Sequence, residues 1–191
     1  MTQSALPASV VAELVAAAGK YLRMPDGVEG ALLARLAAAA VGLGERFLGQ
    51  AMFVRGHEDV LPVSTAWQRL RVAPVVAIQG VTALPIGANG SSATPTGAPS
   101  VLAVGSYALD IDAGGDGWVR VAAANGAGRV TVSYTAGLAT DWAALPEPIA
   151  QGCVALVAHL FEHRDGAAMP PAAVAALWRP FRRLQLAGAV R

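Results

Sequence analysis

The chain has 191 residues, which is enough for one domain, or for one domain with an insertion, and for a substantial buried core. Apolar residues make up 54% of it, but Ala supplies much of this share, and the longest apolar stretches (residues 31–43 and 149–161) are too short and too interrupted to span a bilayer. The net charge of +1 excludes an obvious electrostatic surface for binding nucleic acids.

The N-terminal residues and the single cysteine favour a reducing compartment. Residues 1–7 lack a positively charged stretch before an apolar one, so no signal peptide is expected. Cys153 is the only cysteine and lies in an apolar helical pattern, so it has no intrachain disulfide partner. We therefore expect a buried structural thiol.

The N-terminal part, residues 1–50, predicts two helices. Ser9 is a suitable N-cap for the first, because apolar residues recur at helical spacing directly after it. Pro and Gly in residues 24–27 break this helix. The second helix is expected over residues 28–48, and its many alanines allow neighbours to approach closely.

The central part, residues 51–136, predicts a β-rich module. Short runs rich in Val, Thr and aromatic residues are separated by Gly, Pro and Asn, which is typical of strands and turns. Residues 87–99 contain too few apolar side chains to fold alone and predict a loop. Strands are expected over residues 51–54, 60–63, 68–72, 75–84, 100–109, 118–122 and 129–135.

The C-terminal part, residues 137–191, returns to helix. Pro146, Glu147 and Pro148 are favourable in a first helical turn, because Pro lacks an N–H and Glu complements the helix dipole. We expect Gly166 to end this helix and a shorter one to start near Pro171. The fold class is therefore α+β: a helical bundle formed by the N- and C-terminal helices, with a central β-rich insertion.

One string carries a possible catalytic site. His159, Glu162 and His163 match the H-x-x-E-H pattern of zinc metallopeptidases, in which two histidines on one helix face bind Zn²⁺ and the glutamate acts as general base. A catalytic zinc also needs a third protein ligand, and Asp165 is the only acid downstream. We expect these residues to lie at an exposed helix end, where His and Arg complement the helix dipole. A zinc hydrolase remains a distant alternative.

Other motifs give weaker signals. The sequence from Asp110 and Asp112 onward partly matches the pattern of a calcium-binding loop. It lacks the final Glu that such a loop needs, so a polar turn is the better interpretation. No phosphate-binding glycine motif follows a strand, so we expect no nucleotide and no other cofactor. Four tryptophans could form a sugar-binding surface: Trp67, Trp118, Trp142 and Trp178. This is a further alternative, although scattered tryptophans are more often core or interface residues.

The C-terminal tail concentrates arginines next to aromatic residues. Trp178 and Phe181 alternate with Arg179, Arg182 and Arg183. Trp and Arg are the residues that most often anchor protein interfaces, so this segment predicts contact with a protein partner in preference to nucleic acid.

Several blocks together resemble the head–tail connector (adaptor) proteins of tailed bacteriophages and gene transfer agents, along essentially the whole chain. A short and then a longer helix come first, followed by the family's Pro-Val-x-x-Ile strand, its Tyr-x-Leu-Asp strand, its strand-to-helix transition and its terminal Arg-rich segment. The long loop at residues 87–99 departs from this pattern. The blocks are residues 47–50, 74–81, 107–110, 130–137 with 145–149, 159–164 and 177–184.

The resemblance implies a structural protein of the virion neck without catalytic activity, made in the bacterial host cytoplasm. Such proteins form a ring, usually a dodecamer, beneath the portal protein. The ring continues the channel for DNA ejection, through which DNA passes without specific binding, and it meets a stopper or tail-terminator protein. A head-closure (stopper) or other tail-completion protein is the alternative, although stoppers are mainly β. No membrane is involved, and the resemblance does not separate an infectious phage from a gene transfer agent.

The resemblance and the residue types together assign two surfaces. A heterologous ring contact fits an Ala-rich helical surface with few charges. The expected subunit-interface residues are Leu32, Arg35, Leu36, Glu162, His163 and Arg164. The expected portal-docking residues are Trp178, Arg179, Pro180, Phe181, Arg182, Arg183 and Leu184.

Overall fold

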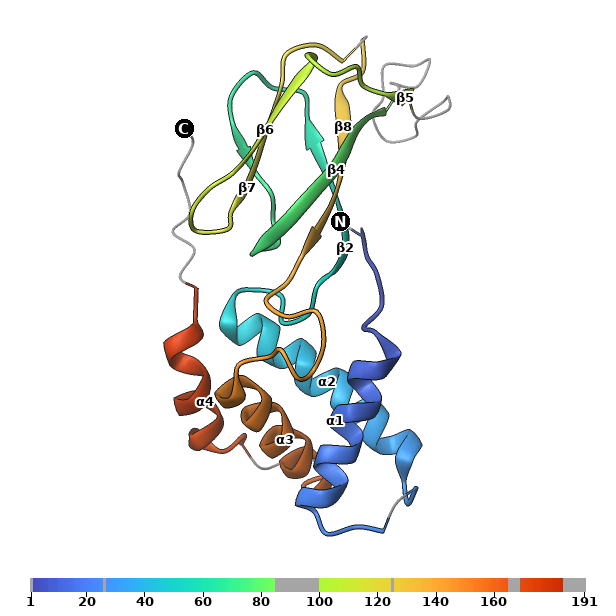
Figure 1. The fold of residues 1–191 in the computed structure, drawn as a ribbon, viewed down its shortest axis with the longest axis vertical. Coiled ribbons are helices and arrows are strands. Elements are labelled where there is room, and N and C mark those ends of the chain that lie inside the picture. The colour runs from blue at the N-terminus through green and yellow to red at the C-terminus, as the bar shows by residue number, and fades with distance from the viewer. Residues whose placement is uncertain (1, 26, 85–99, 125, 165–168, 184–191) are drawn as a thin grey trace. The chain divides into compact units, whose positions relative to one another are not determined.

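The computed structural model of the chain describes residues 2–25, 27–84, 100–124, 126–164 and 169–183 (Figure 1). It contains α-helices and antiparallel sheets, so the predicted mixed α+β class is confirmed. The chain divides into two compact units, which are described separately. The helical unit comprises the described residues of 5–53 and 138–183, and the β unit comprises those of 2–4 and 54–137.

The helical unit contains helices from both ends of the sequence. Pro7 precedes the first helix in an extended conformation, and the N–H of Val11 donates to its carbonyl oxygen at 3.3 Å. Ser9 therefore lies inside the first turn, and the prediction that it is the N-cap is wrong. The elements are α1 (Ala8–Tyr21), α2 (Gly30–Leu48), α3 (Glu147–Glu162) and α4 (Ala172–Trp178), which continues into the short 3-10 helix η1 (Arg179–Phe181).

The ends of α2 and α3 follow from local backbone chemistry. Gly49 ends α2 in the left-handed conformation at φ 68°, and its N–H donates to the Glu45 carbonyl oxygen at 2.9 Å. Such a C-terminal cap favours glycine, because a Cβ is strained there. The α3 helix begins at Pro146 and Glu147, as predicted. It ends at Glu162, earlier than the predicted Gly166, which lies outside the described residues.

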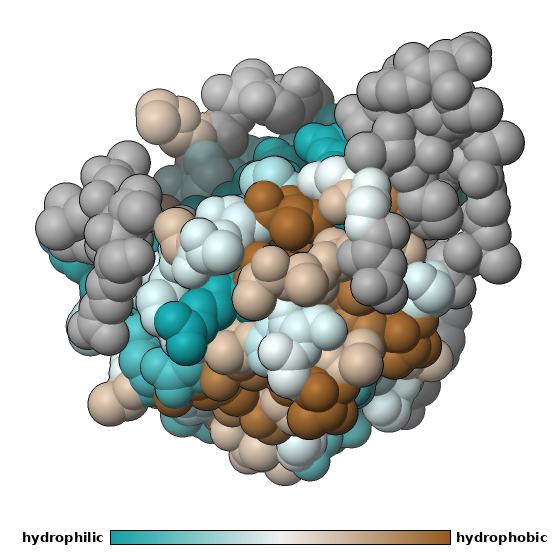
Figure 2. Space-filling view, turned by 90° about the horizontal axis from the view of Figure 1, so that it is seen from above, coloured by the Kyte–Doolittle hydropathy of each residue, from teal (hydrophilic) through white to brown (hydrophobic). Residues whose placement is uncertain are grey.

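The described helices and one face of the molecule show how apolar residues are distributed. Within the described ranges, none of the helices combines the length and the apolar character needed to cross a membrane. Figure 2 shows hydrophobic residues in several patches among paler and hydrophilic ones on the face that it presents.

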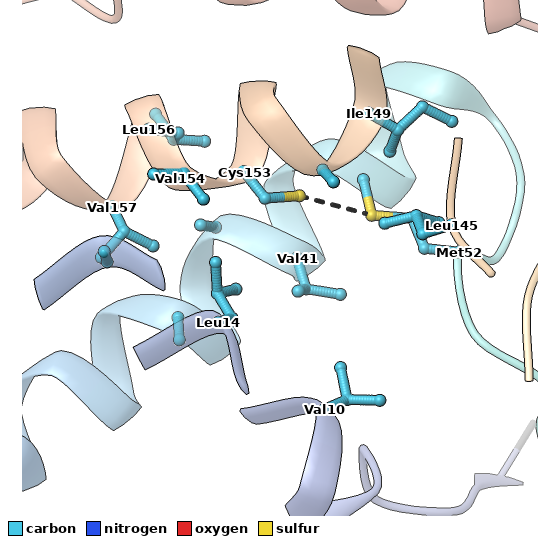
Figure 3. Packing of buried hydrophobic residues seen from close by; sticks show 14 of the residues in the cluster. Val10, Leu14, Val41, Met52, Leu145, Ile149, Cys153, Val154, Leu156 and Val157 are labelled. Atoms are coloured by element: carbon cyan, nitrogen blue, oxygen red, sulfur yellow. Dashed lines mark hydrogen bonds between the residues drawn. The ribbon is translucent and has the colours of Figure 1, made fainter. Parts of the chain in front are cut away.

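The core of the helical unit lies between α1, α2 and α3. Leu14 and Val41 face Ile149 and Cys153 of α3 across this core (Figure 3). The Sγ of Cys153 lies 3.8 Å from the Sδ of Met52, a contact between two polarizable atoms inside an apolar cluster. Cys153 is fully buried, as predicted.

The β unit contains two antiparallel sheets. The five-stranded sheet has the order β1-β2-β8-β4-β5, and the three-stranded sheet has the order β3-β7-β6. Apolar side chains from both sheets form one cluster, so the sheets enclose a single core. The strands are β1 (Thr2–Gln3), β2 (Arg55–Pro62), β3 (Gln68–Arg69), β4 (Val75–Leu84), β5 (Ser100–Val101), β6 (Tyr107–Ile111), β7 (Gly117–Val121) and β8 (Arg129–Ala136).

Two strands show how the alternation of side chains sets this core. In β8 every second residue, from Val130 to Ala136, is buried, and the strand pairs with β2 on one side and β4 on the other. The strand predicted at residues 60–63 is the end of a longer strand, β2, which runs over residues 55–62, and the separate strand predicted at residues 51–54 is wrong. Its inward-facing residues include Arg55, His57 and Asp59, which do not read as core positions.

Candidate interaction sites

Trp178, the first residue of the predicted docking arm, is buried in the helical unit. Its side chain is 3% exposed, and its indole Nε1–H donates to the carbonyl oxygen of Ile149 at 3.1 Å. The ring also lies 6.0 Å from the ring of Phe47 on α2. Trp178 therefore holds the C-terminal segment onto its own helices and, in this conformation, offers no surface to a partner.

Two glycines make room for the indole. A Cβ on Gly152 of α3 would lie 2.7 Å from Cε2 of Trp178, and one on Gly44 of α2 would lie 3.0 Å from its Cη2. Contacts this short require the ring to shift. The sequence signal for this slot is Gly within each of two helical patterns: Gly152 alone in α3, and Gly44 close to Gly42 in α2.

The segment after Trp178 is fixed by hydrogen bonds to the end of α2. The Gln50 side-chain amide donates to the Phe181 carbonyl oxygen at 2.7 Å. The Arg183 N–H donates to the Leu48 carbonyl oxygen, also at 2.7 Å. The Arg182 guanidinium lies 5.6 Å from the centre of the Phe47 ring. The arm is thus a packed continuation of the helical unit over its described part.

The outward side of this segment is cationic. Arg179, Pro180 and Arg182 are exposed, and Phe181 and Arg183 are half-buried. Leu184, the last predicted docking residue, lies outside the described residues. The predicted set thus divides into one buried anchor, Trp178, and an exposed surface formed mainly by two arginines.

The predicted subunit-interface residues occupy two places in the helical unit. On α2, Arg35 is exposed, while Leu32 and Leu36 are half-buried, the latter against the core. The others follow at the end of α3, where Glu162, His163 and Arg164 are exposed. Arg164 pairs with Glu29 at 2.7 Å, but both side chains are too exposed for this pair to stabilise the fold strongly.

The H-x-x-E-H string lies at the end of α3 with its two histidine rings stacked on each other. The centroids of the His159 and His163 rings are 4.4 Å apart, and His159 is buried, so the prediction of an exposed string is wrong for that residue. The ring Nδ1 of His163 lies 3.0 Å from the His159 carbonyl oxygen. In the part of the chain that the structure describes, no three His, Cys, Asp or Glu side chains converge to hold a metal.

The β unit contains a buried polar cluster that the sequence did not reveal. Asp59 is fully buried, and its Oδ2 accepts hydrogen bonds from the Tyr134 hydroxyl at 3.0 Å and the Arg71 N–H at 2.8 Å. Burial, followed by the charge of Asp59, raises the pKa of Tyr134. The ring of His57 stacks on that of Tyr134 at 5.6 Å, and its burial, with Arg55 nearby, lowers its pKa.

The other singled-out residues have structural roles. The Asp112 side chain closes a turn by accepting from the N–H groups of Gly114 and Asp116 and from the indole of Trp118 at 2.9 Å each, so the polar-turn interpretation of the calcium-like string holds. The Arg120 guanidinium lies 4.9 Å from the Trp67 ring centre. Trp142 stacks on Phe53 at 6.4 Å. Trp67 and Trp142 belong to different units, and Trp178 is buried, so these three tryptophans do not form one surface within a unit.

The two units thus consist of packed helices and a β core, and the helical unit exposes arginines and apolar side chains suited to protein contacts. No protein-family model matches the chain, and no curated protein matches it significantly. Solved structures do match it along the whole chain. One is the "Neck of empty GTA particle computed with C6 symmetry", with a TM-score of 0.74, 25% identity and 100% of both chains covered.

Two further matches come from the same kind of particle. A chain of the "Virion of native gene transfer agent (GTA) particle" has a TM-score of 0.71, 26% identity and 99% coverage of both chains. A chain of the "Neck of native GTA particle computed with C12 symmetry" has a TM-score of 0.67, 25% identity and 100% coverage of both. The resemblance to the head–tail connector family is thereby confirmed, and the likeness supports a structural role in a particle neck.

Proposed function

We propose that this chain is the head–tail connector (adaptor) of a tailed phage or a phage-like particle. It forms a ring beneath the portal protein, extends the DNA channel and docks the tail. The observation that carries this proposal is the similarity to chains of GTA necks, which covers 100% of this chain and 100% of the matched chain. The similarity therefore extends over the helical unit as well as the β unit. The C6 and C12 symmetries of those necks support a ring of copies.

The helical unit favours the adaptor over the stopper. Its helices bury a continuous apolar core of their own, so they form a full structural unit beside the β unit. Head-closure proteins are mainly β, so the helical unit of this chain argues against that class. The partners in this role are the portal, a stopper or tail-terminator protein and other copies of the chain, in the neck of a particle assembled from protein made in the bacterial host cytoplasm.

DNA passes through the ring in this role without specific binding. The net charge of +1 agrees with a channel wall that DNA must leave quickly, because phosphate contacts in a strongly basic wall would hold it. A zinc hydrolase has no comparable support, since His159 and His163 stack on each other at the end of α3.

The exposed side of the C-terminal segment is the proposed portal-docking surface. Arg179 and Arg182 project from a backbone that Trp178 and Gln50 fix to the helices. A rigid backbone lowers the conformational entropy lost on binding, and Arg is a frequent interface hot spot. The buried Trp178 therefore acts as the internal anchor of this surface.

The test is co-purification with the portal after charge reversal. The double variant Arg179→Glu and Arg182→Glu should bind the portal at least about tenfold more weakly, because each lost interface arginine costs on the order of 1 kcal/mol or more. Arg23→Glu with Arg129→Glu makes the same change in charge at exposed positions outside this segment of the sequence and should leave binding intact. Equal portal binding by both double variants would refute the docking assignment.

Particle imaging separates the adaptor from the stopper. Necks that contain a tagged form of this chain should show the tag in the ring that touches the portal directly. A tag one ring further from the portal would identify a stopper. Truncation after Leu177 is a poorer test, because it also removes Trp178 from the core of the helical unit.

A further inference from the structure

We infer that neighbouring copies in the ring join through two different surfaces of the helical unit: the exposed face of α2 on one copy and the groove between α1 and α3 on the next. This inference rests on the proposed ring and specifies its subunit contact. Of the predicted interface residues, it retains Arg35 and adds residues that the sequence did not single out.

The exposed face of α2 is smooth except for one apolar side chain and two cations. Leu43 is 45% exposed, and the small, exposed Ala39 lies one turn before it. Ala38, also small and exposed, lies at the opposite edge of this face. Arg35 and Arg46 lie on the same face, since eleven residues span about three helical turns. Among the described residues, neither arginine makes an ion pair within its own copy. Small residues allow a neighbouring surface to approach closely while Leu43 projects into it.

The groove on the other surface is lined by both apolar and polar side chains, with the carboxylate of Glu147 at its rim. It encloses about 560 Å³ between the end of α1 and the start of α3. Ala17, Trp142 and Val154 line it, and the exposed side chains of Tyr21 and Glu147 border it. A space of this size is ample for an aliphatic side chain from a neighbouring helix, and a partly exposed Tyr is a common anchor of protein interfaces.

The two surfaces are complementary in shape and charge. Leu43 and Arg46 are three residues apart on α2, so they are surface neighbours, about 5–6 Å apart between Cβ atoms. The side chain of Leu43 fits against the apolar lining residues of the groove, Trp142 and Val154, while the cation beside it meets the carboxylate of Glu147. Lys20 also borders the groove, from the α1 side, so Arg46 must approach from the α3 side, where Glu147 lies.

The positions of the two surfaces fit a ring. The buried face of α2 packs against α1 and α3, so its exposed face points away from them, and the two surfaces lie on different sides of the helical unit. A contact between two unlike surfaces is heterologous and repeats from copy to copy, whereas a self-complementary patch would stop at a dimer. The occupant of the groove is therefore a second copy of this chain, which agrees with the sixfold and twelvefold symmetries of the similar necks.

The first test is cross-linking in portal-bound complexes. Cys153, the only native cysteine, is fully buried, so added cysteines report with little background. Leu43→Cys combined with Gln151→Cys, an exposed residue bordering the groove, should give a ladder of multimers with a short bis-maleimide. Leu43→Cys with Ala173→Cys, on the exposed side of α4, should not.

The outcomes separate this contact from the proposed function. Portal-bound protein that gives no ladder from the first pair, or cross-links of Leu43→Cys to a different protein, would overturn the subunit contact and leave the adaptor role standing. A chain that never associates with the portal would overturn both. A charge swap gives an independent check: Arg46→Glu should lower the number of copies per neck at least severalfold, and adding Glu147→Arg should restore it. Failure of the swap to restore assembly, with both single variants folded, counts against the contact.

Discussion

The indole of Trp178 occupies a slot above Gly152, from which it donates a hydrogen bond to the carbonyl oxygen of Ile149 at 3.1 Å. This links the last helix of the chain to the first turn of α3 through one side chain. The slot exists because Gly152 and Gly44 carry no Cβ where the ring passes. The exposed arginines after Trp178 thus depend for their position on two glycines.

Filling this slot should destabilise the protein. Gly152→Ala forces the indole to shift and breaks its hydrogen bond to Ile149, and overpacking together with a lost buried hydrogen bond costs about 2–4 kcal/mol of unfolding free energy. Gly19→Ala on α1 is the matched control, because no atom lies within 4 Å of the added Cβ. It should be neutral or raise stability by up to about 1 kcal/mol. Urea unfolding followed by circular dichroism measures both, and equal midpoints would contradict the role of the slot.

The buried cluster in the β unit should show a graded response to mutation. Tyr134→Phe removes one donor to Asp59 and the acceptor of the Val72 N–H, and should cost about 1–2 kcal/mol. Asp59→Ala leaves both the Tyr134 hydroxyl and the Arg71 N–H without their acceptor and creates a cavity, so it should cost more, about 3 kcal/mol or above. The measurement is again the unfolding free energy. A Tyr134→Phe variant less stable than Asp59→Ala would reverse the assigned order.

Some elements of this fold follow from local sequence, and β4 is the clearest. Its predicted bounds, residues 75–84, are those observed, because a run rich in β-branched residues follows a proline and alternates in burial near its end. The start of α3 at Pro146 and Glu147 is equally local. In both cases the information lies within a few residues of the boundary.

Other features depend on partners that are distant in the sequence. The sequence around Asp59 predicts a surface residue, and its burial is explained by hydrogen bonds from the Arg71 N–H and from the hydroxyl of Tyr134, which is 75 positions away. Trp178 clearly needs a partner, but the sequence cannot tell a foreign surface from the chain's own helices. The answer lies in Gly44 and Gly152, which are far from Trp178 along the chain. The groove bordered by Tyr21 and Glu147 is likewise formed only when α1 meets α3.

Stability should fall as the pH drops below about 6.5, because of His57. Burial and the charge of Arg55 lower the pKa of His57 in the folded state below its usual value of 6.5, against the weaker opposite effects of the Ala136 backbone and of Asp59. Above pH 6.5 the ring is neutral in both states and contributes no pH dependence. Below it the unfolded chain binds a proton that the folded chain does not, so unfolding becomes easier by up to about 1.4 kcal/mol per pH unit.

The measurement is the unfolding free energy between pH 7.5 and pH 5 (about the window in which His57 titrates when unfolded and carboxylates do not). His57→Gln should flatten the curve in this window. His163→Gln is the control, because His163 is exposed at the end of α3 and its replacement should leave the slope in place. A slope unchanged in His57→Gln would assign the pH dependence to other groups.

Cys153 should report unfolding through its reactivity. Burial, and then the charge of Glu45, raise the pKa of its thiol to about 12. At pH 8 only about one thiol in ten thousand is then ionised, and the thiolate is the reactive form. A disulfide reagent should therefore leave Cys153 unmodified in the folded protein, label it after denaturation, and label an added Ala173→Cys thiol at once.

The two glycine variants should change the rate of this labelling differently. Because labelling of Cys153 requires opening of the helical core, Gly152→Ala should accelerate it in proportion to the stability that this variant loses, whereas Gly19→Ala should not. Rapid labelling of Cys153 in the native protein would mean that the core between α2 and α3 opens without global unfolding. It would contradict the view that the packing of Trp178 in its slot keeps this core closed.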